Sequence, residues 1–181
     1  MGKVYESIEP RLREFVLNQP LFFVATAPSQ GHVNVSPKGI KGSFVVLDER
    51  RVAYLDYTGS GIETAAHLRD NGRITLMFCA FDGPPKIVRL YGTGEVIMPA
   101  DPRFPALRAL FGGMRDHGVR SVITVDVDRV SDSCGFSVPF LDYVGERTLL
   151  AEWSDHKDDD ELVAYRKERN ATSIDGLPAL S

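Results

Sequence analysis

One junction in the sequence has residue types and spacing suited to binding an anion. It reads Tyr57-Thr58-Gly59-Ser60-Gly61-Ile62-Glu63-Thr64, where a strand-like segment meets a glycine-containing turn and a helix-like segment. The first turn of a helix carries backbone N–H groups without intrahelical partners and the positive end of the helix dipole, which attract phosphate or carboxylate groups. The same residues fit a plain capped helix, because Ser60 and Glu63 have the Ser-x-x-Glu spacing of a capping box. Both interpretations stay open, and the capped helix is the commoner pattern.

Two basic residues on strand-like segments are candidate partners for an anion. Lys38 ends the segment Val35-Ser36-Pro37-Lys38, and an ordinary surface lysine is an equally good interpretation of it. Arg89 alternates with apolar neighbours and therefore projects from a rigid element. For Arg89 the alternative is an exposed cross-strand charge pair.

Other common chemistries lack a sequence signal. The four histidines show no metal-ligand spacing, and no cysteine lies near one of them, so we expect no bound metal. Cys134 has no base beside it in the sequence and is more typical of a small apolar residue. The Gly-x-Ser-x-Gly elbow of hydrolases and the Walker loop of nucleotidases are both missing from the sequence.

Hydrophobic periodicity predicts short strands with few helices between them. Helices are expected from Ser7 to Pro20, over 62–70, from Asp101 to Gly112 and over about 158–170. Strands are expected at 21–26, 32–36, 44–47, 52–57, 74–81, 86–98 and 119–130, with weaker pieces at 136–138 and 140–144. Gly92 and Gly94 indicate tight curvature in the strand that contains them.

This pattern favours a mainly β protein, an antiparallel, closed or nearly closed barrel with flanking helices, over a doubly wound sheet. Residues 1–181 are expected to form a single domain, with a barrel core over about 20–130 and a helical C-terminal extension over 131–181.

The composition argues against several classes of ligand and location for this protein. The chain carries 21 basic and 25 acidic residues, a net charge of −4, so no global positive field exists to hold a nucleic acid. No apolar run is long enough to cross a membrane, and no export segment is recognised. The two cysteines cannot form a disulfide framework, which is typical of the reducing cytoplasm.

Several segments resemble the pyridoxamine 5'-phosphate oxidase-like family, the FMN-binding split barrels. The similarity lies in the Tyr57-Thr58 turn, the helix after it, the strand Asn71-Gly72-Arg73-Ile74-Thr75-Leu76 and the strand from Arg89 to Val96. It covers roughly residues 8–130. The segments Cys134-Gly135-Phe136-Ser137-Val138-Pro139 and Ser173-Ile174-Asp175-Gly176-Leu177-Pro178 are typical of an uncharacterised branch. The resemblance implies a split β-barrel of the antiparallel Greek-key type and a homodimer.

The resemblance also implies a cofactor, FMN, and a set of residues that hold it. In the family, basic residues on the second strand and at the start of the helix bind the phosphate. Lys38 matches the former, but the helix-start pair falls on Glu63 and Thr64. A carboxylate about 4 Å from a phosphate costs on the order of 4 kcal/mol at an effective dielectric near 20. We expect Glu63 to fold back onto the capping box. The expected cofactor residues are Ser36, Lys38, Tyr57, Thr58, Ser60, Thr64 and Arg89, and Lys41 and Lys86 are further available cations.

The implied activity is an FMN-dependent oxidoreductase that acts on a small molecule. The family's Arg-x-His substrate segment has no counterpart in Asp142-Tyr143-Val144-Gly145-Glu146-Arg147, which argues against vitamin B6 oxidation. The sequence nominates no catalytic acid or base. The alternatives are a non-catalytic flavin- or haem-binding protein and a reductase that uses a deazaflavin.

Overall fold

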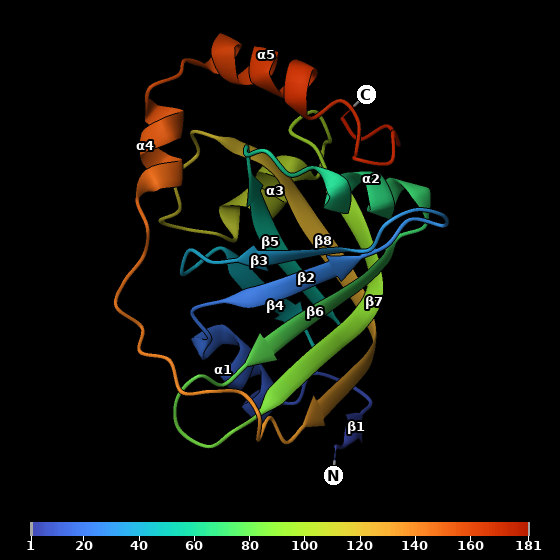
Figure 1. The fold of residues 1–181 in the computed structure, drawn as a ribbon, viewed down its shortest axis with the longest axis vertical. Coiled ribbons are helices and arrows are strands. Elements are labelled where there is room, and N and C mark those ends of the chain that lie inside the picture. The colour runs from blue at the N-terminus through green and yellow to red at the C-terminus, as the bar shows by residue number, and fades with distance from the viewer. Residues whose placement is uncertain (1, 181) are drawn as a thin grey trace.

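The protein folds around one strongly curled antiparallel sheet. A computed structural model describes residues 2–180. The strands follow the spatial order β3-β2-β6-β7-β8-β5-β4, and β1 pairs with β8 (Figure 1). The strands are β1 (Val4–Tyr5), β2 (Phe22–Thr26), β3 (Asn34–Lys38), β4 (Phe44–Asp48), β5 (Arg51–Tyr57), β6 (Arg73–Cys79), β7 (Ile87–Ile97) and β8 (Val119–Ser133). The helices are α1 (Pro10–Asn18), α2 (Glu63–Asp70), α3 (Phe104–Ala109), α4 (Leu149–Asp155) and α5 (Asp159–Arg169).

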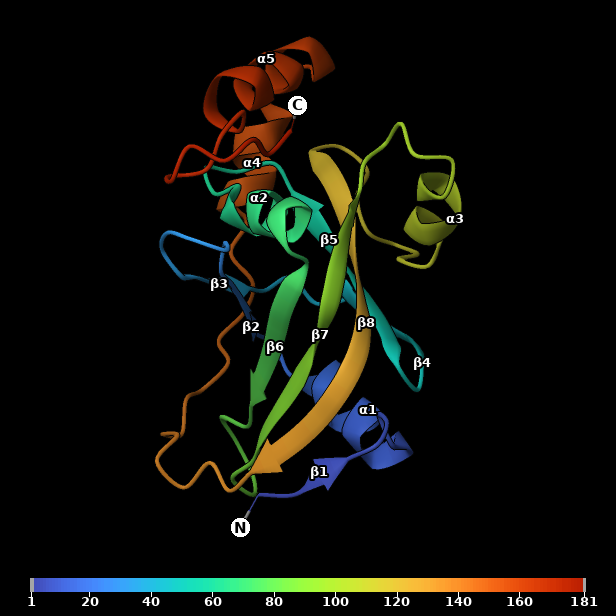
Figure 2. The same cartoon turned by 90° about the vertical axis from the view of Figure 1, so that its right-hand side faces the viewer.

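The strand order confirms the split-barrel prediction, with one refinement. The meander β6-β7-β8 with β5 beside β8 is a Greek key. The described strands do not close into a complete hydrogen-bonded barrel, because β3 and β4 form the two ends of the order. The long strands β7 and β8 bend together (Figure 2). Their register shifts at Gly92, where a Cβ would lie 2.0 Å from the Asp126 carbonyl oxygen, so only glycine permits this close approach.

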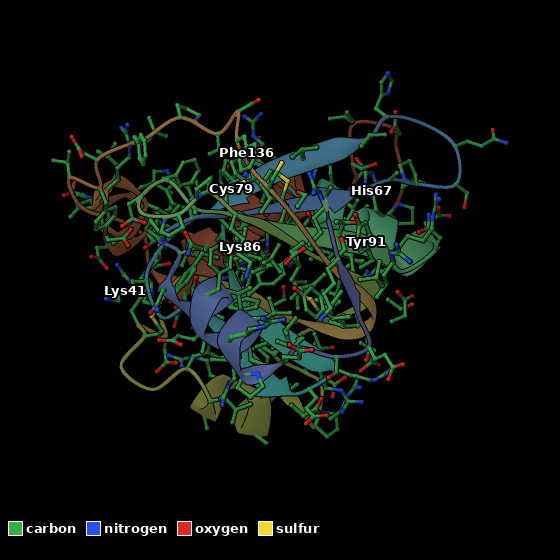
Figure 3. All side chains as sticks on the ribbon, turned by 90° about the horizontal axis from the view of Figure 1, so that it is seen from below. Lys41, His67, Cys79, Lys86, Tyr91 and Phe136 are labelled. Atoms are coloured by element: carbon green, nitrogen blue, oxygen red, sulfur yellow. The ribbon has the colours of Figure 1, made fainter. Side chains whose placement is uncertain are left out.

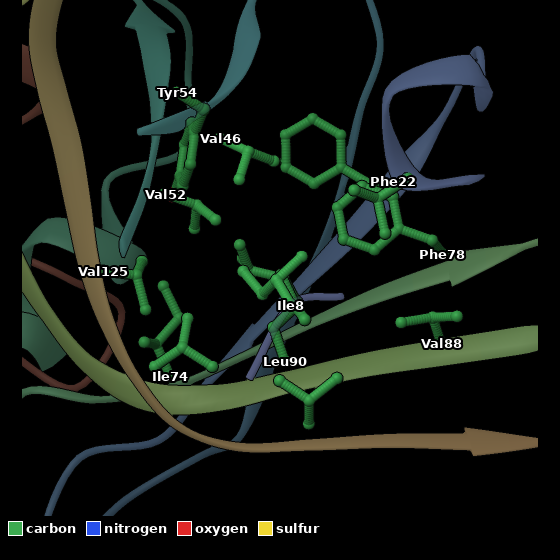
Figure 4. Close-up of a cluster of buried hydrophobic side chains, with 14 of the residues drawn as sticks. Ile8, Phe22, Val46, Val52, Tyr54, Ile74, Phe78, Val88, Leu90 and Val125 are labelled. Carbon is green, nitrogen blue, oxygen red and sulfur yellow. The ribbon is translucent and has the colours of Figure 1, made fainter. Parts of the chain in front are cut away.

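Apolar side chains from the concave side of the sheet form the main core. Alternate residues of β2 and β6 point inward, as the period-two pattern predicts. The rings of Phe22 and Phe78 stack at 5.4 Å between centroids, and Tyr54 meets Phe22 edge-on at 5.6 Å (Figure 4). Helix α1 inserts Leu12 and Val16, both fully buried, into the same cluster. This core holds β5 and β2 rigidly against each other.

Helix α2 follows β5 and packs against the sheet at β2, β6 and β7. Its start and end agree with the predicted helix, and Gly72 adopts a φ of +73° where the helix ends. His67 of α2 is fully buried, with Nδ1 3.0 Å from the Thr26 hydroxyl of β2. The helix therefore has one fixed orientation over the sheet.

The C-terminal extension differs most from the sequence prediction. The weak strands predicted at 136–138 and 140–144 are not formed, and 139–148 runs irregularly along one side of the molecule toward α4 (Figure 1). Helix α4 was not predicted. Helix α5 confirms the predicted polar helix, and Asp158 and Glu161 form a complete capping box. Within residues 2–180, no helix combines the length and apolar character of a membrane span.

Candidate functional site

A cavity of about 840 Å³ opens between β3, β5, the β5–α2 loop and the segment before α4. The main sheet supplies one wall, and Gly145, Glu146, Arg147, Leu149 and Leu150 of the C-terminal extension supply the opposite one. Its apolar lining includes Leu21, Pro37, Ile40, Leu55, Ile62, Ala65, Ile123, Leu149 and Leu150. Hydroxyl and charged groups gather where β3 and the start of α2 meet. The cavity therefore has one polar end and an apolar wall.

Five of the predicted site residues line this cavity: Ser36, Lys38, Tyr57, Ser60 and Thr64. Ser36 and Lys38 lie on one face of β3 because strand residues two apart point the same way. The amide of Asn34 donates to the Ser36 hydroxyl at 3.1 Å and lies 3.5 Å from the Thr64 hydroxyl. These bonds tie β3 to the first turn of α2.

The other two predicted residues lie elsewhere. Thr58 is almost fully buried, and its hydroxyl accepts a 2.8 Å hydrogen bond from Arg166 Nε. It lines a smaller neighbouring cavity of about 170 Å³. Arg89 does not line either cavity and donates to the Ser133 hydroxyl at 3.2 Å. Thr58 thus serves as an anchor for α5, and Arg89 lies outside the lining of the cavity.

The additional cations considered from the sequence also lie outside the cavity lining. Lys41 donates its backbone N–H to Glu146 Oε1 at 3.0 Å, and Lys86 lines a separate cavity beside α1 (both lysines are labelled in Figure 3). This Lys41 bond attaches the segment before α4 to the β3–β4 loop. In that loop Ile40 adopts a φ of +71°, a strained conformation for a β-branched residue.

A buried ion cluster at the cavity floor was missed by the sequence analysis. Asp56 accepts from Arg120 Nε at 2.8 Å and from Lys38 Nζ at 3.3 Å. The side chains of Asp56 and Arg120 are 7% and 4% exposed. Burial alone would raise the pKa of Asp56, but the charges and hydrogen bonds of Arg120 and Lys38 outweigh it and hold that pKa below its usual value. Asp56 is therefore ionised at neutral pH.

The β5–α2 loop is held by side chains that are distant in sequence. Arg120 donates to the Gly61 carbonyl at 2.8 Å, and Asn170 Nδ2 donates to the Gly59 carbonyl at 3.0 Å. The two side chains also contact each other, Arg120 Nη1 donating to Asn170 Oδ1 at 2.8 Å. The loop conformation thus depends on β8 and on the end of α5.

The predicted capping box of Ser60 and Glu63 is wrong. The helix begins at Glu63, so Ile62 is the N-cap and the Ser60 side chain caps nothing. The Glu63 carboxylate does fold back, and it accepts the Ile62 N–H at 3.0 Å. Ser60 lies before the N-cap, in a loop whose Gly59 and Gly61 carbonyls are bound by Asn170 and Arg120. The Glu63 carboxylate therefore already binds one backbone N–H group at the start of α2, that of Ile62.

The described residues contain no group of three or more His, Cys, Asp or Glu side chains that could hold a metal ion. The chemistry available at the cavity is binding: hydroxyls, one partly exposed lysine and backbone N–H groups at the polar end, and an apolar wall beside them. Such a division suits an elongated ligand with an anionic group at one end and a flat apolar body.

Comparisons with known proteins agree with the fold. The family model of pyridoxamine 5'-phosphate oxidase matches residues 8–134. A pyridoxamine 5'-phosphate oxidase family protein of Aspergillus flavus, ustO, is 45% identical over 191 aligned residues, which cover 97% of this chain and 77% of the relative.

Solved structures with the same fold include HupZ of Group A Streptococcus, at 25% identity and a TM-score of 0.56, covering 70% of this chain and 99% of HupZ. An FAD-binding protein from Mesorhizobium loti is 14% identical with a TM-score of 0.52, covering 73% of this chain and 95% of that protein. The family match over most of the chain and the high identity to the fungal relative lead to one conclusion: this chain belongs to the pyridoxamine 5'-phosphate oxidase family.

Proposed function

We propose that this protein is an FMN-dependent oxidoreductase that acts on a small molecule. The observation that carries the proposal is the cavity itself, in which five residues expected to hold FMN line one pocket of about 840 Å³. Family membership supports the same cofactor class, and a solved structure described as an FMN-binding protein of Syntrophomonas wolfei has the same fold, at 12% identity and a TM-score of 0.50, covering 68% of this chain and 86% of that protein.

The polar end of the cavity fits a phosphate group. Ser36, Ser60 and Thr64 contribute hydroxyl donors, and Lys38 contributes a positive charge with 26% of its side chain exposed. The free N–H groups at the start of α2 add backbone donors and the helix dipole. We assign these groups to the phosphate. Lys38 is shared with Asp56, so its charge is only partly available to a ligand.

The apolar wall fits a flat ring system. Leu55 and Ile123 lie on neighbouring strands, and Leu149 and Leu150 approach from α4. These residues would hold a flavin ring, which would supply hydride acceptance and electron transfer to a second acceptor. The protein's part is to orient the ring and exclude water, and the segment 145–150 provides that cover.

The acid–base groups of the cavity also favour a second candidate, a flavin-binding protein without turnover. Asp56 is the buried acid of the cavity, and both of its oxygens are committed to cations. With its pKa lowered, it cannot donate a proton near neutral pH. A substrate that needs no protein acid, or a purely binding role, is consistent with this arrangement.

The proposal includes a cytoplasmic homodimer. Large apolar side chains are exposed along the segment after β8: Phe136, Phe140, Leu141, Tyr143 and Val144, with Val144 98% exposed. A run of exposed apolar side chains of this kind is typical of a segment that contacts another protein chain. Cys79 and Cys134 are both free thiols, which suits a reducing compartment.

The first experiment is a visible absorption spectrum of the purified protein, repeated after FMN addition and desalting. A retained flavin spectrum supports the cofactor assignment, and bleaching by NADH or NADPH with reoxidation by oxygen supports an oxidoreductase. Retained flavin that no hydride donor reduces would favour the binding protein. Loss of FMN in both samples would contradict the assignment, and haem and deazaflavin titrations would then identify the ligand.

A further inference from the structure

The β5–α2 loop is shaped by a residue outside the segment that the family model matches. That match ends at residue 134, whereas Asn170 lies at the C-terminal end of α5. Asn170 is fully buried, and its side-chain amide makes two hydrogen bonds. Oδ1 accepts from Arg120, and Nδ2 donates to the Gly59 carbonyl. Nδ2 also lies 3.5 Å from the Ser60 carbonyl oxygen.

These bonds determine where the loop's N–H groups point. In a trans peptide the C=O and the next N–H are antiparallel, and no described peptide bond is cis. With the carbonyls of Gly59, Ser60 and Gly61 directed toward Asn170 and Arg120, the N–H groups of the three residues that follow point the opposite way. Three consecutive N–H groups on one side of a loop form an anion-binding concavity.

A carboxylate of the chain itself already lies on that side of the loop. The Ile62 N–H is already bound by the Glu63 carboxylate, and Glu63 lines the cavity. Within residues 2–180, the N–H groups of Ser60 and Gly61 have no hydrogen-bond partner. In this concavity the Ile62 N–H thus binds the Glu63 carboxylate, and the neighbouring N–H groups of Ser60 and Gly61 are available to a ligand.

We propose that Asn170 is a positioning residue for the phosphate of the bound flavin, acting through the backbone of Gly59, Ser60 and Gly61. Arg120 is its partner, and α5 is therefore part of the cofactor site rather than an accessory helix. Arg166 supports the same arrangement by binding the Thr58 hydroxyl at 2.8 Å. This inference rests on the proposed function, because it assigns the phosphate end of the same cavity.

The test compares FMN with riboflavin, which lacks the phosphate, in fluorescence-quenching titrations of the wild type and Asn170→Ala. Loss of the amide removes its hydrogen bonds to the loop, so FMN affinity is expected to fall about five- to tenfold, with riboflavin affinity changed less than about twofold. Val163→Ala, an exposed and uncharged change on the same helix, is the matched control and is expected to leave both affinities unchanged.

A second variant keeps the test valid if Asn170→Ala does not fold. Asn170→Asp keeps an acceptor for Arg120 but cannot donate to the Gly59 carbonyl, and it is expected to show the same selective loss of FMN affinity. Equal losses of FMN and riboflavin affinity in a folded variant would assign Asn170 a general structural role and overturn the proposal. Wild-type affinity for both FMN and riboflavin in the two variants would overturn it as well.

A flavin-independent readout separates this inference from the proposed function. Inorganic phosphate is titrated into the flavin-free protein while the amide signals of Ser60 and Gly61 are followed by NMR. Shifts in the wild type that are lost in Asn170→Ala support the positioning role, even if FMN itself fails to bind. If both proteins respond alike, or neither responds, Asn170 does not organise an anion site.

Discussion

Arg120 Nε and Asp56 Oδ2 lie 2.8 Å apart in the floor of the cavity, and both side chains are almost fully enclosed. The two residues pair across β5 and β8, 64 positions apart in the chain. Arg120 reaches from this ion pair to the β5–α2 loop and to Asn170. The buried ion pair, the β5–α2 loop and Asn170 therefore belong to one hydrogen-bonded network.

Breaking this pair should destabilise the protein. Arg120→Met leaves Asp56 with Lys38 alone and frees the loop carbonyls, so the free energy of unfolding is expected to fall by about 3–5 kcal/mol. Urea denaturation followed by circular dichroism measures the change. Arg51→Met, which breaks the exposed pair of Arg51 with Asp126, is the control and should have almost no effect. Equal stabilities of the two variants would contradict the role assigned to Arg120.

Acidification should weaken the fold through Asp56. Its pKa is lower in the folded than in the unfolded protein, so it stabilises the fold above its unfolded pKa of about 3.9, and this stabilisation disappears as the pH falls through the lower folded pKa. Unfolding free energies measured from pH 7 to pH 3 should therefore decline less steeply below about pH 4 in Asp56→Asn than in the wild type. Asp128→Asn, an exposed change on β8, should retain the wild-type slope.

Removing the charge of Glu63 should tighten FMN binding. Glu63→Gln keeps a side-chain oxygen near the Ile62 N–H but no longer repels a phosphate at the start of α2. An increase of about tenfold in FMN affinity is expected, which corresponds to about 1.4 kcal/mol. Riboflavin affinity serves as the internal reference and should stay constant. Glu6→Gln, remote from the cavity, is the matched control; a gain there as large as at position 63 would indicate a general charge effect.

Lys38 should contribute to FMN affinity despite its bond to Asp56. Lys38→Ala removes a lysine that lines the polar end of the cavity, and FMN binding is expected to weaken by about 1.5–3 kcal/mol. Isothermal titration calorimetry gives the affinity, and a thermal melt checks the fold. Lys41→Ala, which changes a lysine outside the cavity lining, should bind FMN like the wild type. Wild-type affinity in Lys38→Ala would remove Lys38 from the site.

The exposed apolar segment after β8 should be needed for self-association. The double variant Phe140→Ser with Val144→Ser removes two of its most exposed apolar side chains and is expected to convert the homodimer to a monomer. Size-exclusion chromatography with light scattering gives the mass. Val33→Ser, at a valine of the β2–β3 loop that is 70% exposed, should remain dimeric. A monomeric wild type would contradict the proposed dimer directly.

Local signals in the sequence were sufficient for most of the sheet. The alternation in β7 and the apolar character of β6 predicted both strands to within two residues, because side chains alternate on any strand irrespective of its partners. Asn71-Gly72 predicted the end of α2 for a similar local reason. Helix α4 escaped prediction because it is short and is bound by residues far away in the chain, such as Arg115, which pairs with Asp155.

Local patterns were enough to predict the family, the order of the strands along the chain and five residues that line the cavity, because each depends on neighbours within a few positions. Which charges are buried, and what they bind, became visible only in the folded protein. Asp56 has two cations, Glu63 takes the Ile62 N–H, and Asn170 orients the loop through bonds between residues far apart in the chain. Periodicity carries no information about such pairs, since they form only once the sheet has curled and the end of α5 has met the β5–α2 loop.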